Sequence, residues 1–266
     1  MSKLGYKWLN NVWLSKTAIL CCNALLLPFV LPLIAWLVIC QCYSAVLSGV
    51  SGSVGGATVL TLIGLLPCAL VYSVGLAGAV YCYKEMLVDG NMDVRRQFAR
   101  GIKKNALKYL LFSFILWLSS VAVTVTPTLY SYMGISLLYG IGLAVSIFQL
   151  LVIAPAMCLC MMQCAFYDDK LRHCFMNSFK LCFMRPLRTI GVTLASALPF
   201  CLCPILPFVP QLVFWVLFAT VGVSIGMIFY IWYAKRYFDS VVGRIQPTDD
   251  VVALGKDEPP VEIVIE

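Results

Sequence analysis

Cysteine is the residue type in this sequence with the widest capacity for chemistry. Thirteen cysteines occur, and their close groups are Cys21-Cys22, Cys40-x-Cys42, Cys158-x-Cys160 with Cys164, and Cys201-x-Cys203. Paired thiols can bind a soft metal such as copper(I). Cysteine is also a small residue that is readily buried, and these cysteines stand among Leu, Val and Met. Burial is the favoured interpretation, so we predict no metal site and no cofactor.

The only histidine, His173, and its neighbours Asp168 and Asp169 are the other residues suited to catalysis. Placed at a membrane surface, they could serve a lipid-modifying enzyme. No G-x-S-x-G nucleophile motif lies near them, since the one match, Gly222-Val223-Ser224-Ile225-Gly226, falls inside a predicted span. The sequence also contains no phosphate-binding glycine loop to support that hypothesis. We therefore predict that the protein is not an enzyme and has no catalytic residue.

The composition indicates the surroundings of these residues. Hydrophobic residues make up 62% of the 266 positions and charged residues 12%, whereas soluble domains contain about 45–50% and about 25%. The stretches without Lys, Arg, Asp, Glu or His run from Lys16 to Lys84, from Lys108 to Asp168 and from Arg188 to Lys235. Each stretch is long enough for two membrane-spanning helices of about 20 residues. The sequence thus predicts an integral membrane protein.

Gly, Ser and Pro residues near the middle of each stretch are typical of turns. We predict an all-α fold, a polytopic membrane bundle of six transmembrane helices. Their expected ranges are 17–43, 58–83, 108–126, 135–166, 189–208 and 211–233. Apart from Lys108 at a boundary, these ranges hold no ionisable Asp, Glu, Lys, Arg or His, which disfavours carriers driven by protons or sodium.

The distribution of Lys and Arg predicts the orientation. Three precede the first predicted span, seven lie between the second and third, five lie between the fourth and fifth, and four follow the sixth, which accounts for all 19. Basic loops favour the cytoplasmic side. We predict a multi-pass protein of the cytoplasmic membrane with both termini in the cytoplasm. The same distribution argues against a nucleic-acid partner.

The first basic loop has a helical pattern. Val94, Phe98, Ile102 and Ala106 recur every fourth residue among basic residues, and Asp93 could cap the start. This predicts an amphipathic helix in the headgroup layer.

The second basic loop repeats the pattern with Leu171, Phe175, Phe179 and Phe183. The two predicted cytoplasmic helices could anchor the bundle, or they could bind anionic lipid headgroups or a partner protein. The contact residues predicted for the second use are Arg95, Arg96, Arg100, Lys103, Lys104, Asn105, Arg185 and Arg188.

The end of the chain has another character. From Asp239 onward it holds seven acidic residues and three prolines, a composition typical of disorder. We therefore divide the chain into a transmembrane domain, 1–238, and an acidic tail, 239–266.

Uncharged polar residues within the predicted spans are candidates for lining a pore. Asn23, Gln149 and Gln163 are the most prominent. Such residues also form hydrogen bonds between helices, which is their commoner use.

Two short blocks resemble the YesL family of bacterial integral membrane proteins, whose function is unknown. The first runs from Gly78-Ala79-Val80 through Leu87-Val88-Asp89-Gly90 to Phe98 and Lys103-Lys104-Asn105. The second comprises Asn177-Ser178-Phe179 and Arg185-Pro186-Leu187-Arg188-Thr189-Ile190. The resemblance covers roughly residues 5–235 and implies a bacterial origin and a connection with carbohydrate uptake.

Two functions follow as hypotheses. The leading one is a non-enzymatic accessory or regulatory component that associates with carbohydrate transporter subunits. The alternative is a channel or facilitator for a neutral small solute, since passive passage requires no buried charge.

Overall fold

The structure is a computed structural model that describes residues 16–47, 54–90, 92–133, 136–167, 170–202 and 208–245. Every regular element in this part of the chain is helical, which confirms the all-α prediction. Four helices among the described residues are long and apolar enough to cross a membrane: Lys16–Cys40, Val59–Asp89, Val94–Thr126 and Tyr139–Phe166. Long apolar helices of this kind are typical of membrane proteins. Of the predicted acidic tail, 239–266, residues 246–266 lie outside the described residues, whereas 239–245 are helical and belong to the last helix.

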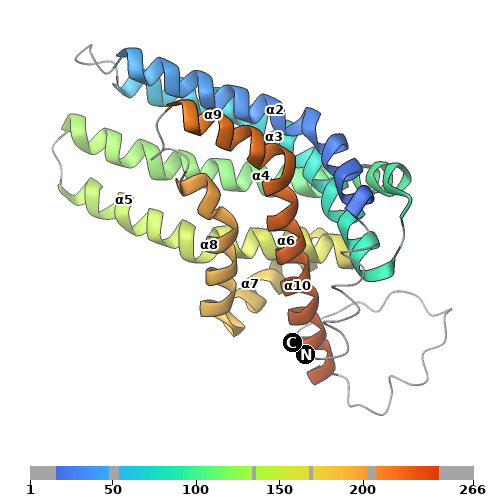
Figure 1. Cartoon of the computed structure of the whole chain (residues 1–266). Helices are drawn as coiled ribbons and strands as arrows, with labels where there is room; N and C mark the ends of the chain where they lie inside the picture. Colours follow the sequence, from blue (N-terminus) through green and yellow to red (C-terminus); the bar gives the residue numbers. More distant parts are fainter. Residues whose placement is uncertain are drawn as a thin grey trace.

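The bounds of the helices are α2 (Lys16–Leu47), α3 (Val54–Lys84), α4 (Val94–Met133), α5 (Ser136–Phe148), α6 (Ala154–Phe166), α7 (Leu171–Met184), α8 (Pro186–Leu202), α9 (Phe208–Leu217) and α10 (Val223–Ile245). One π-turn, Gln149–Ile153, joins α5 to α6, and another, Phe218–Gly222, joins α9 to α10. In Figure 1, α2, α3, α4 and the α5–α6 helix follow one another side by side, and α8 and α10 cross them at a steep angle. This crossing places α8 against both α6 and α10.

The π-turn between α5 and α6 has a local cause. Pro155 lacks the N–H that would bond the carbonyl of Leu151, and its ring crowds that carbonyl. The wider turn immediately before it, Gln149–Ile153, accommodates this interruption without ending the helix. The predicted helix 135–166 is therefore present in two parts.

The structure corrects the prediction for the first basic loop. No separate amphipathic helix lies there, because α4 continues from Val94 to Met133 without interruption. Its start is as predicted, since the backbone N–H of Arg96 donates to Oδ1 of Asp93 at 3.4 Å. Val94 and Phe98 are buried inside the protein. The stripe that includes them contacts neighbouring helices rather than the headgroup layer.

The second basic loop contains a separate helix, as predicted. α7 ends at Met184, Arg185 adopts a non-helical backbone conformation, and Pro186 begins α8. Proline is favoured at the first position of a helix, where its missing N–H has no intrahelical partner. The last helix extends further than predicted, to Ile245, so Lys235, Arg236 and Arg244 belong to α10.

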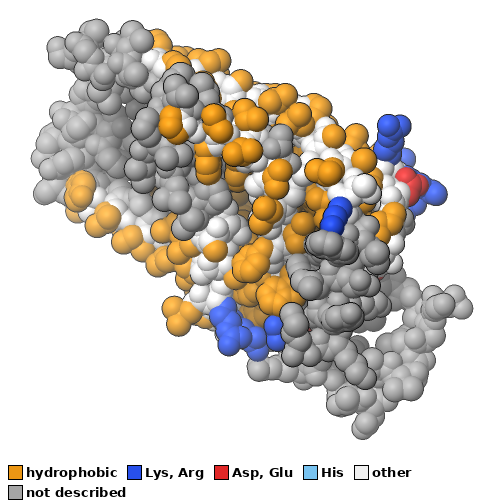
Figure 2. Space-filling view, viewed as in Figure 1, with side chains coloured by type: hydrophobic (Ala, Val, Ile, Leu, Met, Phe, Trp, Pro, Cys, Tyr) orange, Lys and Arg blue, Asp and Glu red, His pale blue; other side chains and the backbone are white. Residues whose placement is uncertain are grey.

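Figure 2 shows hydrophobic side chains across most of the described surface in this view. The Lys and Arg side chains visible in this view lie in separate places, at the right-hand end of the molecule and over the lower end of α8. A mostly apolar surface with cationic groups at its margins is typical of a protein that contacts lipid.

Candidate functional site

The predicted contact residues on α4 have different surroundings. Arg95, Arg96, Arg100 and Lys103 are exposed on its first turns. Asn105 is fully buried, so it cannot contact a partner. The helical period explains this correction, because position 105 follows Phe98 by two turns and faces the interior with it.

The predicted pore residue Asn23 lies in a buried junction of three helices. Its Oδ1 accepts hydrogen bonds from the hydroxyl of Tyr83, at 2.6 Å, and from the hydroxyl of Ser224. These residues belong to α2, α3 and α10. Asn23 therefore joins helices, which is the commoner use of a polar residue in a span.

The other two predicted pore residues lie elsewhere. Nε2 of Gln149 donates to the hydroxyl of Ser120 on α4, at 3.0 Å. Oε1 of Gln163 accepts from the hydroxyl of Ser178 on α7, at 3.1 Å. The structure does not bring Asn23, Gln149 and Gln163 together around one passage.

The residues considered for catalysis or metal binding do not come together as a site in the described part of the chain. Asp168 and Asp169 lie outside the described residues, and His173 is half-buried on α7. Within the described ranges, no three His, Cys, Asp or Glu side chains gather closely enough to hold a metal ion.

A pocket does form around the predicted contact residues Arg185 and Arg188. It has a volume of about 500 Å³, within the range of small-molecule sites. Its walls come from the start of α8 and from one face of α10. The complete lining is Arg185, Arg188, Trp232, Tyr233, Arg236, Tyr237 and Ser240.

Two hydrogen bonds hold α10 in position beside α8. The hydroxyl of Tyr237 donates to the carbonyl of Leu181 on α7 at 2.6 Å. The hydroxyls of Tyr233 and Thr189 lie 2.9 Å apart, which links α10 to the first turns of α8. Arg236 lies between these two anchors on α10 and lines the same pocket as Arg185 and Arg188.

The charge of this pocket is strongly positive. Arginine stays protonated throughout the physiological pH range. Arg185 lies 5.6 Å from the centre of the Tyr237 ring, and Arg236 lies 5.5 Å from that of Trp232. Neither these two residues nor Arg188 forms a salt bridge with a described carboxylate. Among the described residues, no carboxylate therefore neutralises these three guanidinium groups.

The tyrosine in this pocket does not offset the positive charge. Burial raises the pKa of Tyr237 to about 12, from an ordinary value near 10. The phenol therefore stays neutral at physiological pH and keeps its hydrogen bond to Leu181.

The α10 side of this site was not predicted from the sequence. Arg236 was expected only as one of the positive charges that follow the last predicted span. The signal that could have located the site is the spacing of Trp232, Arg236 and Ser240, together with Tyr233 and Tyr237. These positions recur every fourth residue and form one aromatic and cationic helix face.

Comparisons with protein-family models, with curated proteins and with solved structures found no match to this chain. Membership of the YesL family therefore stays a prediction.

Proposed function

We propose that this chain is a non-enzymatic integral membrane protein that binds an anionic lipid headgroup in the pocket between α8 and α10. The observation that carries the proposal is the convergence of Arg185, Arg188 and Arg236 without a described carboxylate partner. Arginine forms paired charge-assisted hydrogen bonds with phosphate. Aromatic residues such as Trp232 are typical of the membrane–water interface.

The start of α8 adds to this preference for anions. Pro186 is the first residue of the helix, so the positive end of the helix dipole lies at Arg185 and Arg188. Anionic lipids are concentrated in the cytoplasmic leaflet, and we propose that this end of the six-span bundle faces it.

The proposal can be tested by native mass spectrometry of the protein in neutral detergent. Phosphatidylglycerol and phosphatidylcholine with identical chains would be added in increasing amounts. We expect the first lipid to bind preferentially. The variant R185Q/R188Q/R236Q should weaken its binding by at least about tenfold, because each basic residue near a membrane contributes about 1 kcal/mol.

A matched control is the variant R95Q/R96Q/R100Q. It removes the same charge from the exposed start of α4, and we expect it to keep the preference for phosphatidylglycerol. An equal loss of binding in both variants would mean that overall charge, and not the pocket, attracts the lipid.

The accessory role with a carbohydrate transporter is a further part of the proposal. The resemblance to the YesL family motivates it, and the exposed Arg95, Arg96 and Arg100 offer a surface for a partner. Mild-detergent purification from native membranes should then recover transporter subunits, and charge reversal at these three arginines should release them. Recovery of this protein alone would contradict the role.

The proposed orientation, with six spans and both termini in the cytoplasm, has its own test. A fluorescent protein that folds only in the cytoplasm would be fused after the last residue. We expect bright cells, and dark cells with a full-length fusion would contradict the orientation.

A further inference from the structure

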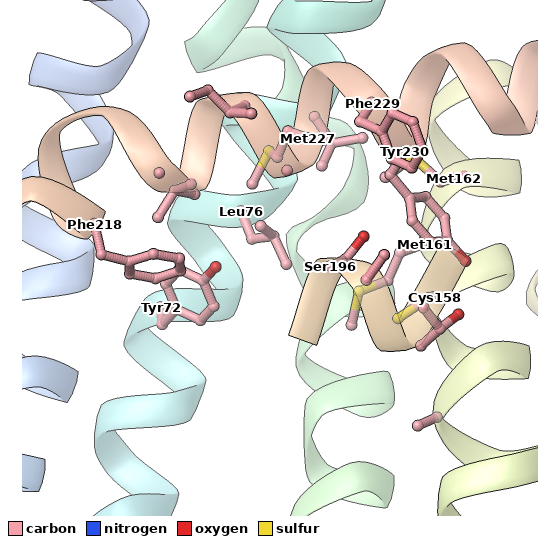
Figure 3. A pocket seen from close by; sticks show the side chains of 18 residues that line it. Tyr72, Leu76, Cys158, Met161, Met162, Ser196, Phe218, Met227, Phe229 and Tyr230 are labelled. Carbon is pink, nitrogen blue, oxygen red and sulfur yellow. The ribbon is translucent and has the colours of Figure 1, made fainter. Parts of the chain in front are cut away.

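A second hollow lies beside the arginine pocket, deeper along the same helices. It is a cavity of about 660 Å³ between α3, α6, α8 and the helix that contains α10. Figure 3 shows side chains from all four helices around it, including Tyr72 and Leu76, Met161, Ser196, and Met227. Carbon and sulfur atoms dominate its walls, so the cavity suits a hydrocarbon group rather than water or an ion.

Small residues keep the cavity open. Ala154, Ala195 and Gly226 are part of its wall. A Cβ atom added at Gly226 would meet nothing within 4 Å. Ile225 and Phe229 also line the cavity, and both side chains are exposed on the apolar surface. The cavity thus adjoins a surface that a lipid chain can reach from the bilayer.

The cavity and the arginine pocket are neighbours along both α8 and α10. Thr193 and Tyr230 line the cavity, while Arg188 and Tyr233 line the pocket. The rise along the α8 axis from Arg188 to Thr193 is about 7.5 Å, and the rise along the α10 axis from Tyr230 to Tyr233 is about 4.5 Å. The hydrogen-bonded pair Thr189 and Tyr233 lies between the two hollows, so a single extended molecule that occupies both would pass over this pair.

The length of the cavity is suited to an acyl chain. The cavity lining on the last helix extends from Phe218 to Tyr230, which is about 18 Å of helix. Half of a hydrocarbon core is about 15 Å thick. The arginine pocket lies beyond the Tyr230 end of the cavity lining.

We propose that the two hollows form one site for a phosphate-bearing membrane lipid. The phosphate lies among Arg185, Arg188 and Arg236, and one acyl chain leaves the bilayer to occupy the apolar cavity. This inference rests on the proposed function and adds the chain to it. A site that binds the phosphate through its arginines and an acyl chain through its cavity would prefer an anionic lipid to a soluble phosphate.

Photocrosslinking can locate the chain. The probe is phosphatidylglycerol that carries a diazirine near the end of one acyl chain, added to phosphatidylcholine vesicles that contain the full-length protein. After illumination, mass spectrometry would identify the labelled peptides. We expect labels on the cavity residues Met161 and Met227, which belong to α6 and α10.

A cavity-filling variant makes the test specific. Gly226→Leu should raise the probe concentration for half-maximal cavity labelling about tenfold, because it displaces buried methylene groups. Gly191→Leu is the matched control, since Gly191 is exposed on α8 and an added Cβ meets nothing within 4 Å. It should leave labelling unchanged.

The outcomes separate this inference from the proposed function. Labels confined to exposed apolar residues such as Leu137 and Ile147, with no effect of Gly226→Leu, would overturn the inference. The arginine-dependent preference for phosphatidylglycerol would then still stand. If R185Q/R188Q/R236Q changed neither the preference nor the cavity labelling, both proposals would fall. A soluble short-chain glycerophosphate that displaced the probe at equal concentration would also overturn the role of the chain.

Discussion

Asn23 shows how one polar side chain stabilises several helices. It accepts hydrogen bonds from Tyr83 and Ser224, and all three side chains are buried or nearly so. A buried hydroxyl that loses its acceptor has no access to water, so its desolvation is no longer compensated. The hydrogen bonds of Asn23 therefore fix the relative positions of α2, α3 and α10.

Asn23→Ala should lower the free energy of unfolding by about 1–2 kcal/mol, because two buried donors lose their acceptor. The measurement is the thermal midpoint in detergent. Ser146→Ala is the control, since that hydroxyl bonds only the carbonyl of Gly142 in its own helix and should matter less. Equal midpoints for the two variants would contradict the account of Asn23.

Tyr237 gives a prediction about pH. Burial raises its pKa to about 12 in the folded protein, above the value near 10 of an unfolded chain. The preference for the neutral phenol therefore stabilises the fold fully below about pH 10, and this contribution is lost as the pH rises toward about 12. Tyr237→Phe should show a shallower fall of the thermal midpoint over this interval. A fall as steep as that of the original protein would contradict the prediction.

At the scale of elements, α3 and α4 pack closely against each other at Gly101. A Cβ atom at Gly101 of α4 would lie 2.6 Å from Cβ of Tyr81 and 2.9 Å from the carbonyl oxygen of Ala77. Such an approach requires a glycine, as is common between membrane helices. This contact places the start of α4 against α3, where the sequence predicted a separate helix in the headgroup layer.

Gly101→Ala should destabilise the protein by about 1–3 kcal/mol, because the added methyl group would force the two helices apart. Gly140→Ala is the matched control, since Gly140 is exposed and its added Cβ meets nothing within 4 Å. The control should change stability by no more than about 0.5 kcal/mol. The measurement is again thermal unfolding in detergent, and a neutral Gly101→Ala would contradict the close packing.

The presence of long apolar helices could be predicted from the sequence, because it depends only on an apolar composition and on the length of the stretches without charged residues. The boundaries of α4 and α10 could not, since the basic residues that suggested loops are compatible with exposed helix faces. The burial of Asn105 depends on the partner helix. Arg185 and Arg188 were predicted contact residues, but Arg236 was not, because its proximity arises from how α8 crosses α10.

For the whole molecule, we expect lipid binding to have an electrostatic contribution and a hydrophobic contribution, which respond differently to salt. Phosphate contacts of Arg185, Arg188 and Arg236 weaken as salt screens charge, whereas burial of an acyl chain does not. Phosphatidylglycerol binding should therefore fall with added salt to a plateau in the original protein. Gly226→Leu should lower that plateau, and a plateau unchanged by this substitution would contradict the chain contribution.

The most direct measurement is an experimental structure of the protein in phosphatidylglycerol nanodiscs. The account predicts density for a phosphate group in contact with Arg185, Arg188 and Arg236, continuous with a chain that occupies the cavity beside Met161 and Gly226. An arginine pocket empty of lipid, or closed by the protein's own side chains, would contradict it.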